Sequence, residues 1–374
     1  MNFKLTNNQR LCLGLKPILQ GWEKVRYNDS LYLYFEGDGI KKGITVTDNT
    51  YHEYELDYAT SNNRTILLPK TNKGKSKKIT PSVISNLNPT GTYFYFDEDI
   101  TIANYTNQRT YYSTYYLNKN YTSFQQLNEW LNKWCINMSS KDIGEITTFS
   151  NSPKIHQKFN EGDFFRLKID KDKYCFGRIL LNADKFRKQS KEENLGLNNL
   201  MGKPIAAKIY HVISNDKDID VYYLKSLNAL PSQYIMDNVF YYGDCEIIEN
   251  LPLEKSELDF PIQYGRSLGY GQEDIIYFQC GKISKISTTT KMKEFIESRN
   301  SSLKTVNSFF AMNGIGWSFG FNIDILNACI NENSNMPYWN SDFHCNIKQD
   351  LRNPMFAEQT EDVFEFFEIN MHCK

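Results

Sequence analysis

The feature that most constrains the fold is the segment 158–187, which has the pattern of two strands joined by a charged turn. Phe165, Leu167 and Ile169 alternate with Arg166 and Lys168, the period of two that is typical of a half-buried strand. Four charged residues at 170–173 predict a solvated turn, after which a second apolar strand returns. The segment therefore predicts an antiparallel hairpin with one buried face.

Two glycines shape this predicted hairpin. Gly162 and Asp163 form a bend that needs a permissive backbone conformation. Gly177 lies inside the second strand, where a glycine indicates a bulge or the close approach of another chain segment. The hairpin contains no pattern typical of a nucleophile, a metal cage or a phosphate-binding loop.

The hairpin resembles the opening of the immunity-protein-26 family over about a third of the chain at most, roughly 155–281. The matching positions are Phe159, Glu161, Gly162, Asp163, Phe165, Ile169, Asp170, Tyr174, Phe176, Gly177, Arg178, Ile179 and Leu180. The resemblance implies a protein that neutralises a toxin of a bacterial polymorphic-toxin system by binding it. It implies no catalytic residues at these positions.

Length and composition extend this expectation to the whole chain. A chain of 374 residues exceeds the usual size of one hydrophobic core, and 14% aromatic residues favour strands. We expect a mainly β (α+β) protein with a β-rich domain at 1–150 and an immunity-like β domain at 151–374 with a helical C-terminal extension. The second domain is expected to hold a small, strongly bent sheet or a partial barrel.

Periodicity places several elements within this outline. Ser123 as an N-cap, followed by Phe124, Leu127 and Leu131 at helical spacing, predicts a helix near 123–135 that closes the first domain. The polar stretches 139–142 and 150–153 are typical of linkers. Further along, 189–199 has the composition of a polar insertion, 221–224 of a strand, and 291–298 and 323–331 of helices.

The sequence also predicts the compartment. No apolar run approaches the ~18 residues that a membrane span needs, and the N-terminus lacks the apolar stretch of a signal peptide. The eight cysteines include no Cys-x-x-Cys pair and are best interpreted as free thiols. We therefore expect a soluble cytoplasmic protein.

No pattern in the sequence predicts a catalytic residue, a metal site or a cofactor. His344-Cys345 and His372-Cys373 would supply zinc ligands, but adjacent residues on a strand point to opposite faces. The glycine-rich run 313–320 has neither the spacing of a dinucleotide fingerprint nor a following Lys-Ser/Thr. A hydrolase whose residues converge only in three dimensions remains an open alternative.

Five lysines between Lys70 and Lys78 form the most basic stretch of the chain. One interpretation is a contact for nucleic acid or phosphate; the other is a solvated surface loop. Residues 1–150 hold 17 basic and 14 acidic residues, and the remainder holds 26 and 30. So mild an asymmetry argues against a dedicated nucleic-acid binder, which would carry a strongly basic domain.

The C-terminal run 358–368 mixes acidic and aromatic residues. One interpretation is a face that attracts a basic toxin, with aromatic side chains supplying the main contacts. The other is an amphipathic closing strand with a solvated acidic edge. The two interpretations are compatible.

The resulting hypothesis is an immunity protein that binds its cognate toxin by surface complementarity without catalysis. Candidate partner-binding residues are Glu161, Asp163 and Arg178, which we expect to be exposed on the hairpin, and the acidic residues Glu361, Asp362 and Glu365. The hairpin residues have an alternative role as an internal polar network that fixes the sheet. The competing function is a nucleic-acid or phosphate-binding module that uses the basic stretch from Lys70 to Lys78.

Overall fold

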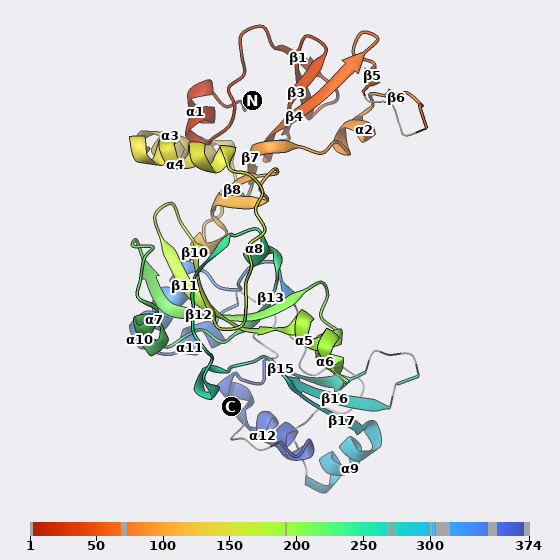
Figure 1. Ribbon diagram of the computed structural model, residues 1–374, viewed down its shortest axis with the longest axis vertical. Helices are drawn as coiled ribbons and strands as arrows, with labels where there is room; N and C mark the ends of the chain where they lie inside the picture. Colours follow the sequence, from red (N-terminus) through yellow and green to blue (C-terminus); the bar gives the residue numbers. More distant parts are fainter. Residues whose placement is uncertain are drawn as a thin grey trace. The chain divides into compact units, whose positions relative to one another are not determined.

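The computed structural model divides into two compact units, Met1–Ile155 (unit 1) and His156–Lys374 (unit 2) (Figure 1). It describes residues 3–68, 73–190, 193–267, 269, 271–272, 274–299, 301, 303, 315–342 and 350–369. Each unit is described separately below.

Unit 1 is built on one antiparallel sheet in which each strand pairs mostly with its neighbour in the sequence. The main strands, in spatial order, are β1 (Glu23–Arg26), β2 (Leu31–Glu36), β3 (Gly39–Val46), β4 (Tyr51–Ser61), β7 (Thr90–Asp97), β8 (Asp99–Asn104) and β9 (Arg109–Ser113). The short strands β5 (Ile66–Leu67) and β6 (Lys77–Lys78) extend from the end of β4. Such local pairing follows from the short turns that separate the strand-like segments.

Helices cover both faces of this sheet. Their bounds are α1 (Asn7–Cys12), α2 (Pro81–Ser85), α3 (Phe124–Ile136) and α4 (Ser140–Asn151), with a 3-10 turn η1 at Tyr115–Leu117. Helix α3 begins after the N-cap Ser123 and buries Leu127, Leu131 and Trp134, as its spacing predicts. The Trp134 indole nitrogen donates to the Cys12 carbonyl at 2.9 Å, so the packing also ties α3 to α1.

Helix α4 corrects the expectation that 139–142 is a linker. The Ser139 hydroxyl accepts from the Asp142 amide at 3.2 Å, while the Asp142 carboxylate accepts from the Ser139 amide at 2.8 Å. This reciprocal capping box starts a helix that buries Ile146. Small polar residues are typical of linkers, but serine and aspartate are also the preferred residues at helix starts.

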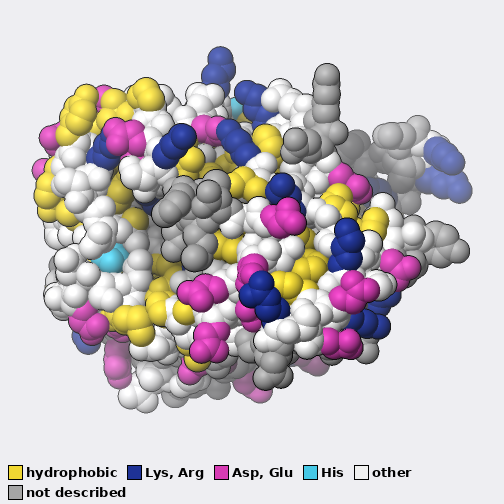
Figure 2. All heavy atoms as spheres, turned by 90° about the horizontal axis from the view of Figure 1, so that it is seen from below, with side chains coloured by type: hydrophobic (Ala, Val, Ile, Leu, Met, Phe, Trp, Pro, Cys, Tyr) yellow, Lys and Arg dark blue, Asp and Glu magenta, His cyan; other side chains and the backbone are white. Residues whose placement is uncertain are grey.

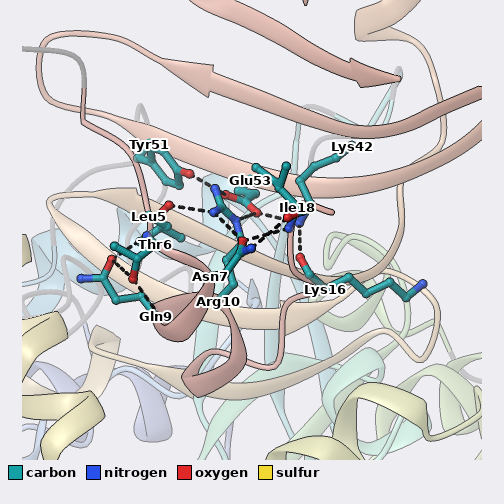
Figure 3. A network of polar contacts seen from close by, with 10 residues as sticks. All are labelled: Leu5, Thr6, Asn7, Gln9, Arg10, Lys16, Ile18, Lys42, Tyr51 and Glu53. Carbon is teal, nitrogen blue, oxygen red and sulfur yellow. Dashed lines mark hydrogen bonds and ion pairs between the residues drawn. The ribbon is translucent and has the colours of Figure 1, made fainter. Parts of the chain in front are cut away.

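A buried ionic cluster lies under the sheet of unit 1 (Figure 3). The Glu53 carboxylate accepts from Arg10 Nε at 2.7 Å, from Lys42 Nζ at 2.6 Å and from the Tyr51 hydroxyl at 2.5 Å. All four side chains are buried. Although burial opposes ionisation, the two cations hold the pKa of Glu53 below its usual value. Helix α1, which carries Arg10, is thereby joined to the centre of β3 and β4.

Unit 2 contains a six-stranded sheet that includes the predicted hairpin. The strands, in spatial order, are β14 (Cys245–Asn250), β10 (Asp163–Lys168), β11 (Tyr174–Asn182), β12 (Pro204–Ser214), β13 (Gln233–Met236) and β18 (Ile315–Gly316). All pairs are antiparallel except β13 with β18. Gly177 lies at an irregularity between β11 and β12, where an added Cβ would approach the Lys208 carbonyl to 2.3 Å. The expected close approach at this glycine is therefore confirmed.

A second sheet in unit 2 has three antiparallel strands, β15 (Ile262–Arg266), β16 (Ile275–Cys280) and β17 (Ile283–Thr288). Its core combines Phe278 of β16 with side chains of the helices α9 (Thr289–Arg299) and α12 (Ala357–Phe366). Buried contributors include Met292 on α9 and Val363 and Phe364 on α12. The C-terminal region thus contributes helices α9 and α12 to a hydrophobic core.

The other helices in the described part of unit 2 have at most ten residues. They are α5 (Ala183–Gln189), α6 (Leu195–Asn198), α7 (Val221–Ser226), α8 (Asn238–Tyr241), α10 (Ile323–Glu332) and α11 (Met336–Trp339), with 3-10 turns η2 (Lys255–Glu257) and η4 (Pro354–Phe356). Helix α6 lies within the predicted polar insertion and buries Leu195 and Leu197. That stretch therefore contributes to the core and is not a purely solvated insertion.

Two segments expected as strands are helices. In α7 the spacing of Val221 and Leu224 places both side chains on one buried face, and Asp220 caps the first turn. In α12 the acidic residues recur every three or four positions, the spacing of a helix face. Aromatic and β-branched content suggested strands, but tertiary packing decided both cases. The mainly β, α+β class is confirmed, with open sheets among the described residues.

Candidate partner-binding surface

The β10–β11 hairpin forms as predicted, and its register places Phe164 opposite Arg178 and Lys168 opposite Tyr174. Gly162 adopts a φ of +88°, and an added Cβ would lie 2.3 Å from the Leu251 carbonyl. Only glycine fits this bend without strain. The bend brings the start of the hairpin against the end of β14.

Residues on both sides of this bend hold the segment that follows β14. The Asp163 carboxylate accepts from the Asn250 side-chain amide at 2.7 Å and from the Asn160 backbone amide at 2.6 Å. The Glu161 carbonyl accepts from the same Asn250 amide at 3.0 Å. Asp163 is only 3% exposed. Its carboxylate is an internal hydrogen-bond acceptor.

Arg178 on β11 binds the same segment. Its guanidinium donates to the Leu251 carbonyl at 2.8 Å and to the Pro252 carbonyl at 3.0 Å, and it forms an ion pair with Glu257. The guanidinium also lies 4.3 Å above the Phe164 ring. Arg178 is fully buried. A buried arginine in such a fork fixes a loop and leaves no donor directed at solvent.

The structure therefore brings Glu161, Asp163 and Arg178 together on one short segment, 250–252. The expectation that Asp163 and Arg178 are exposed is wrong. Both side chains are buried because they form hydrogen bonds with backbone and side-chain groups where the chain leaves β14. Glu161 is partly exposed and pairs with Lys282 at 3.0 Å. The alternative of an internal polar network agrees with this geometry.

A largely buried arginine, with a side chain that is 11% exposed, joins the C-terminal region to the rest of unit 2. Arg352 donates to the Asp350 carboxylate at 2.7 Å, to the Asp259 carboxylate at 2.9 Å and to the Ser232 carbonyl at 2.8 Å. The two nearby carboxylates raise the pKa of Arg352, which stays charged despite its burial. The segment around Arg352 is thus fixed to the residue before β13 and to the chain before β15.

The acidic candidates on α12 have different environments. Glu361 is exposed. Glu365 is also exposed and forms an ion pair with Arg299 of α9. Asp362 is half-buried and accepts a hydrogen bond from the Ser301 hydroxyl. Helix α12 thus presents carboxylates to solvent, although one is paired with a cation.

Figure 2 shows one face of the molecule with acidic and basic side chains interspersed among hydrophobic ones. Charges mixed in this way weaken each other's long-range field. A docking surface on this protein is therefore better identified by the local combination of exposed aromatic and charged groups than by charge alone.

Helix α7 provides such a combination and was missed in the sequence. Tyr222 is 65% exposed and Tyr223 is 52% exposed, whereas Val221 and Leu224 are buried. The available signal was the N-cap Asp220 followed by an apolar pair three residues apart. Recognising it requires the segment to be predicted as a helix and not as a strand.

The basic stretch lies in unit 1, and its first lysine, Lys70, falls outside the described residues. Lys73, Lys75, Lys77 and Lys78 are exposed. Nearby, Arg64 pairs with Glu23 at 2.7 Å and lies over the Phe35 ring. Lys73 and Lys75 precede β6, Lys77 and Lys78 form it, and no aromatic residue lies among these four lysines.

Unit 1 also contains a pocket of about 340 Å³ beside the buried ionic cluster. Three lysines and three carboxylates line it. Two ion pairs form among them, Lys16 with Glu55 at 2.7 Å and Lys41 with Asp57 at 2.9 Å. Opposite charges in equal number favour neither an anionic nor a cationic ligand.

Among the residues that the structure describes, no three histidine, cysteine or acidic side chains are grouped so that they could hold a metal ion. The pairs His344-Cys345 and His372-Cys373 lie outside the described residues. His52 is surrounded by the rings of Tyr54, Tyr93, Tyr95 and Tyr105, and burial lowers its pKa to about 4. In the described part of the chain, no helix is both long and apolar enough to span a bilayer.

Comparison with known proteins agrees with the hairpin geometry. No curated protein and no solved structure matches the chain. One family model does match, and it covers a segment that includes the hairpin, β12, α7, β13, β14 and β15. The resemblance predicted from the hairpin is confirmed for this part of unit 2: residues 160–274 match the family Immunity protein 26.

Proposed function

We propose that this protein is a cytoplasmic immunity protein that binds a cognate bacterial toxin and blocks it without catalysis of its own. The observation that carries the proposal is the match of residues 160–274 to Immunity protein 26. The geometry supports it, because the buried contacts of Asp163 and Arg178 give that segment a rigid scaffold. Rigid scaffolds bind with a low cost in conformational entropy.

The hairpin carboxylates and Arg178 have a supporting role in this proposal. Asp163 and Arg178 hold the segment 250–252 in place and so act on binding through the shape of the scaffold. In this proposal Glu361, Asp362 and Glu365 on α12 provide a second contact for a basic partner. Helix α12 lies outside the matched segment.

The experiment is co-purification with the catalytic domain of the toxin encoded next to this protein. The full-length chain should co-elute with that domain in size-exclusion chromatography and should protect cells that express it. The catalytic domain of an unrelated toxin serves as the control. Absence of both the complex and the protection would reject the proposal.

A second function is favoured by the exposure of Lys73, Lys75, Lys77 and Lys78. Four exposed lysines on β6 and the residues just before it would bind the phosphates of a nucleic acid through counterion release, with an affinity that falls steeply as salt increases. Fluorescence anisotropy with labelled single-stranded RNA and DNA at low salt tests this function. Binding that disappears in a Lys73→Glu, Lys77→Glu, Lys78→Glu variant would support it, whereas no binding of the unmodified protein would exclude it.

A further inference from the structure

Helix α7 holds two adjacent tyrosines in solvent inside the segment that matches Immunity protein 26. Tyr222 and Tyr223 are 65% and 52% exposed. On the opposite side of the helix, Val221 and Leu224 pack into a core cluster with Phe164 of the hairpin and other buried residues. The rings are therefore exposed while their backbone is fixed.

The chain that leads into α7 is also held in place. Arg166 on β10 donates to the Lys217 carbonyl at 3.0 Å and to the Asp218 carboxylate at 2.8 Å. The Asp218 amide donates to the Asp216 carboxylate at 2.9 Å. Because these contacts order the loop before any partner arrives, docking on this surface would cost little conformational entropy.

The surroundings of the two tyrosines are acidic. Asp216, Asp218 and Asp220 are exposed in the loop before α7, and Glu254 is joined to α7 through an ion pair with Lys225. Counting Glu246, which shares Arg166 with Asp218, the surface holds five carboxylates against three cations, Arg166, Lys217 and Lys225. These eight residues sum to a net charge of −2, and Arg166 and Lys225 are already engaged in ion pairs.

We propose that this surface, formed by Asp216, Asp218, Asp220, Tyr222, Tyr223 and Glu254 and called here the α7 face, docks a basic surface of the toxin. The proposal rests on the function proposed above and adds the place and the charge of the contact. Tyrosine is among the residues that supply most of the binding energy at protein interfaces, because a large, stiff ring is buried at a small entropic cost. The carboxylates of the α7 face, called here the acidic rim, favour a partner of opposite charge.

Other exposed groups of unit 2 fit this role less well. Trp317 is 70% exposed, but it stands beside the two-residue strand β18 and outside the matched segment. At α12 the aromatic side chains of Phe364 and of the C-cap residue Phe367 are buried, and Glu365 is neutralised by Arg299. Of these three surfaces, only the α7 face combines exposed aromatic rings, an excess of acid and a position within the matched residues.

The test uses the full-length protein and the catalytic domain of the toxin encoded next to it, with binding followed by biolayer interferometry. The Tyr222→Ala, Tyr223→Ala double variant should raise Kd about 100-fold, roughly tenfold for each ring. Its thermal unfolding should stay unchanged, because both rings are exposed. Trp317→Ala is the matched control, since it removes an equally exposed aromatic ring elsewhere on the same unit.

A charge variant tests the acidic rim separately. Asp216→Asn, Asp220→Asn keeps the capping geometry of α7, because asparagine caps helices as well as aspartate does. It should slow association about three- to tenfold at low salt, and the effect should fade at high salt.

The outcomes separate this inference from the function on which it rests. If the unmodified protein does not bind the toxin domain, the proposed function fails. If it binds and the tyrosine variant binds equally well, only the α7 face is wrong. A loss of affinity in Glu361→Lys, Glu365→Lys without a loss in the tyrosine variant would place the contact on α12 and overturn the inference, as would an equal loss in Trp317→Ala.

Discussion

The hairpin and helix α7 belong to the same matched segment, yet they direct their polar and aromatic groups in opposite ways. Arg178 and Asp163 on the hairpin are buried and bind the segment 250–252. Tyr222 and Tyr223 on α7 are exposed. The hairpin residues that carry the family resemblance thus build the scaffold. The residues best placed to bind a partner lie on a short helix that the sequence pattern predicts only weakly. Changes at buried charges should therefore affect stability, and changes on α7 should affect binding.

The largest loss of stability is expected in unit 1, where charges are buried as they are in the hairpin. Glu53→Ala leaves Arg10 and Lys42 buried without their anion and should cost about 3–5 kcal/mol of unfolding free energy. Asp57→Ala, which removes the exposed partner of Lys41, should cost less than about 1 kcal/mol. Urea unfolding followed by tryptophan fluorescence measures both. Similar losses in the two variants would contradict the role given to the buried cluster.

Arg178→Ala should be the most damaging single change in the hairpin. It removes an ion pair and two hydrogen bonds to carbonyls and leaves Glu257 without its main partner, at a cost of about 3 kcal/mol. Arg178→Lys should recover part of this, because a lysine keeps the charge but cannot reproduce the fork. Lys282→Ala, which breaks the partly exposed pair with Glu161, is the control.

Acidification should destabilise unit 1 through His52. The pKa of His52 is about 4 in the folded protein against 6.5 for an unperturbed histidine, so the unfolded chain binds its proton first as the pH falls. Stability should therefore be complete above pH 6.5 and should decline by at most about 3 kcal/mol as the pH falls to 4. Titration of the His52 ring by NMR checks the value directly. A midpoint near 6.5 would remove this contribution.

The smallest effect on stability is expected at Tyr222 and Tyr223. Substitution of exposed side chains away from caps and buried networks usually changes the unfolding free energy by less than about 0.5 kcal/mol. The double alanine variant should therefore unfold like the unmodified protein in calorimetry while it loses affinity for the toxin domain. If the variant lost stability and binding together, α7 would have a structural role like that of the hairpin, which would contradict this account.

Much of the fold could be predicted because the relevant signals are local. Alternation in 163–182 predicts the hairpin, and the glycines at 162 and 177 mark its bend and its close approach. Helix α3 follows from its N-cap and apolar spacing. The errors at Ser139, α7 and α12 arose where composition suggested one element and capping or three-residue spacing indicated another.

The candidate site was harder to predict, because exposure depends on contacts between distant segments. Nothing local to Arg178 indicates that Leu251, Pro252 and Glu257 surround it. The burial of Asp163 likewise depends on Asn250. Pairings across about 75–90 residues arise from the placement of β14 beside β10, which the pattern of either strand alone does not specify.

The central claim is that this protein neutralises a toxin by forming a complex with it. The most direct measurement is a titration of the toxin's catalytic activity with purified full-length protein. The account predicts that activity falls linearly and is abolished near one equivalent, with the Tyr222→Ala, Tyr223→Ala variant requiring a large excess. Full toxin activity in the presence of a large excess of the unmodified protein would contradict it.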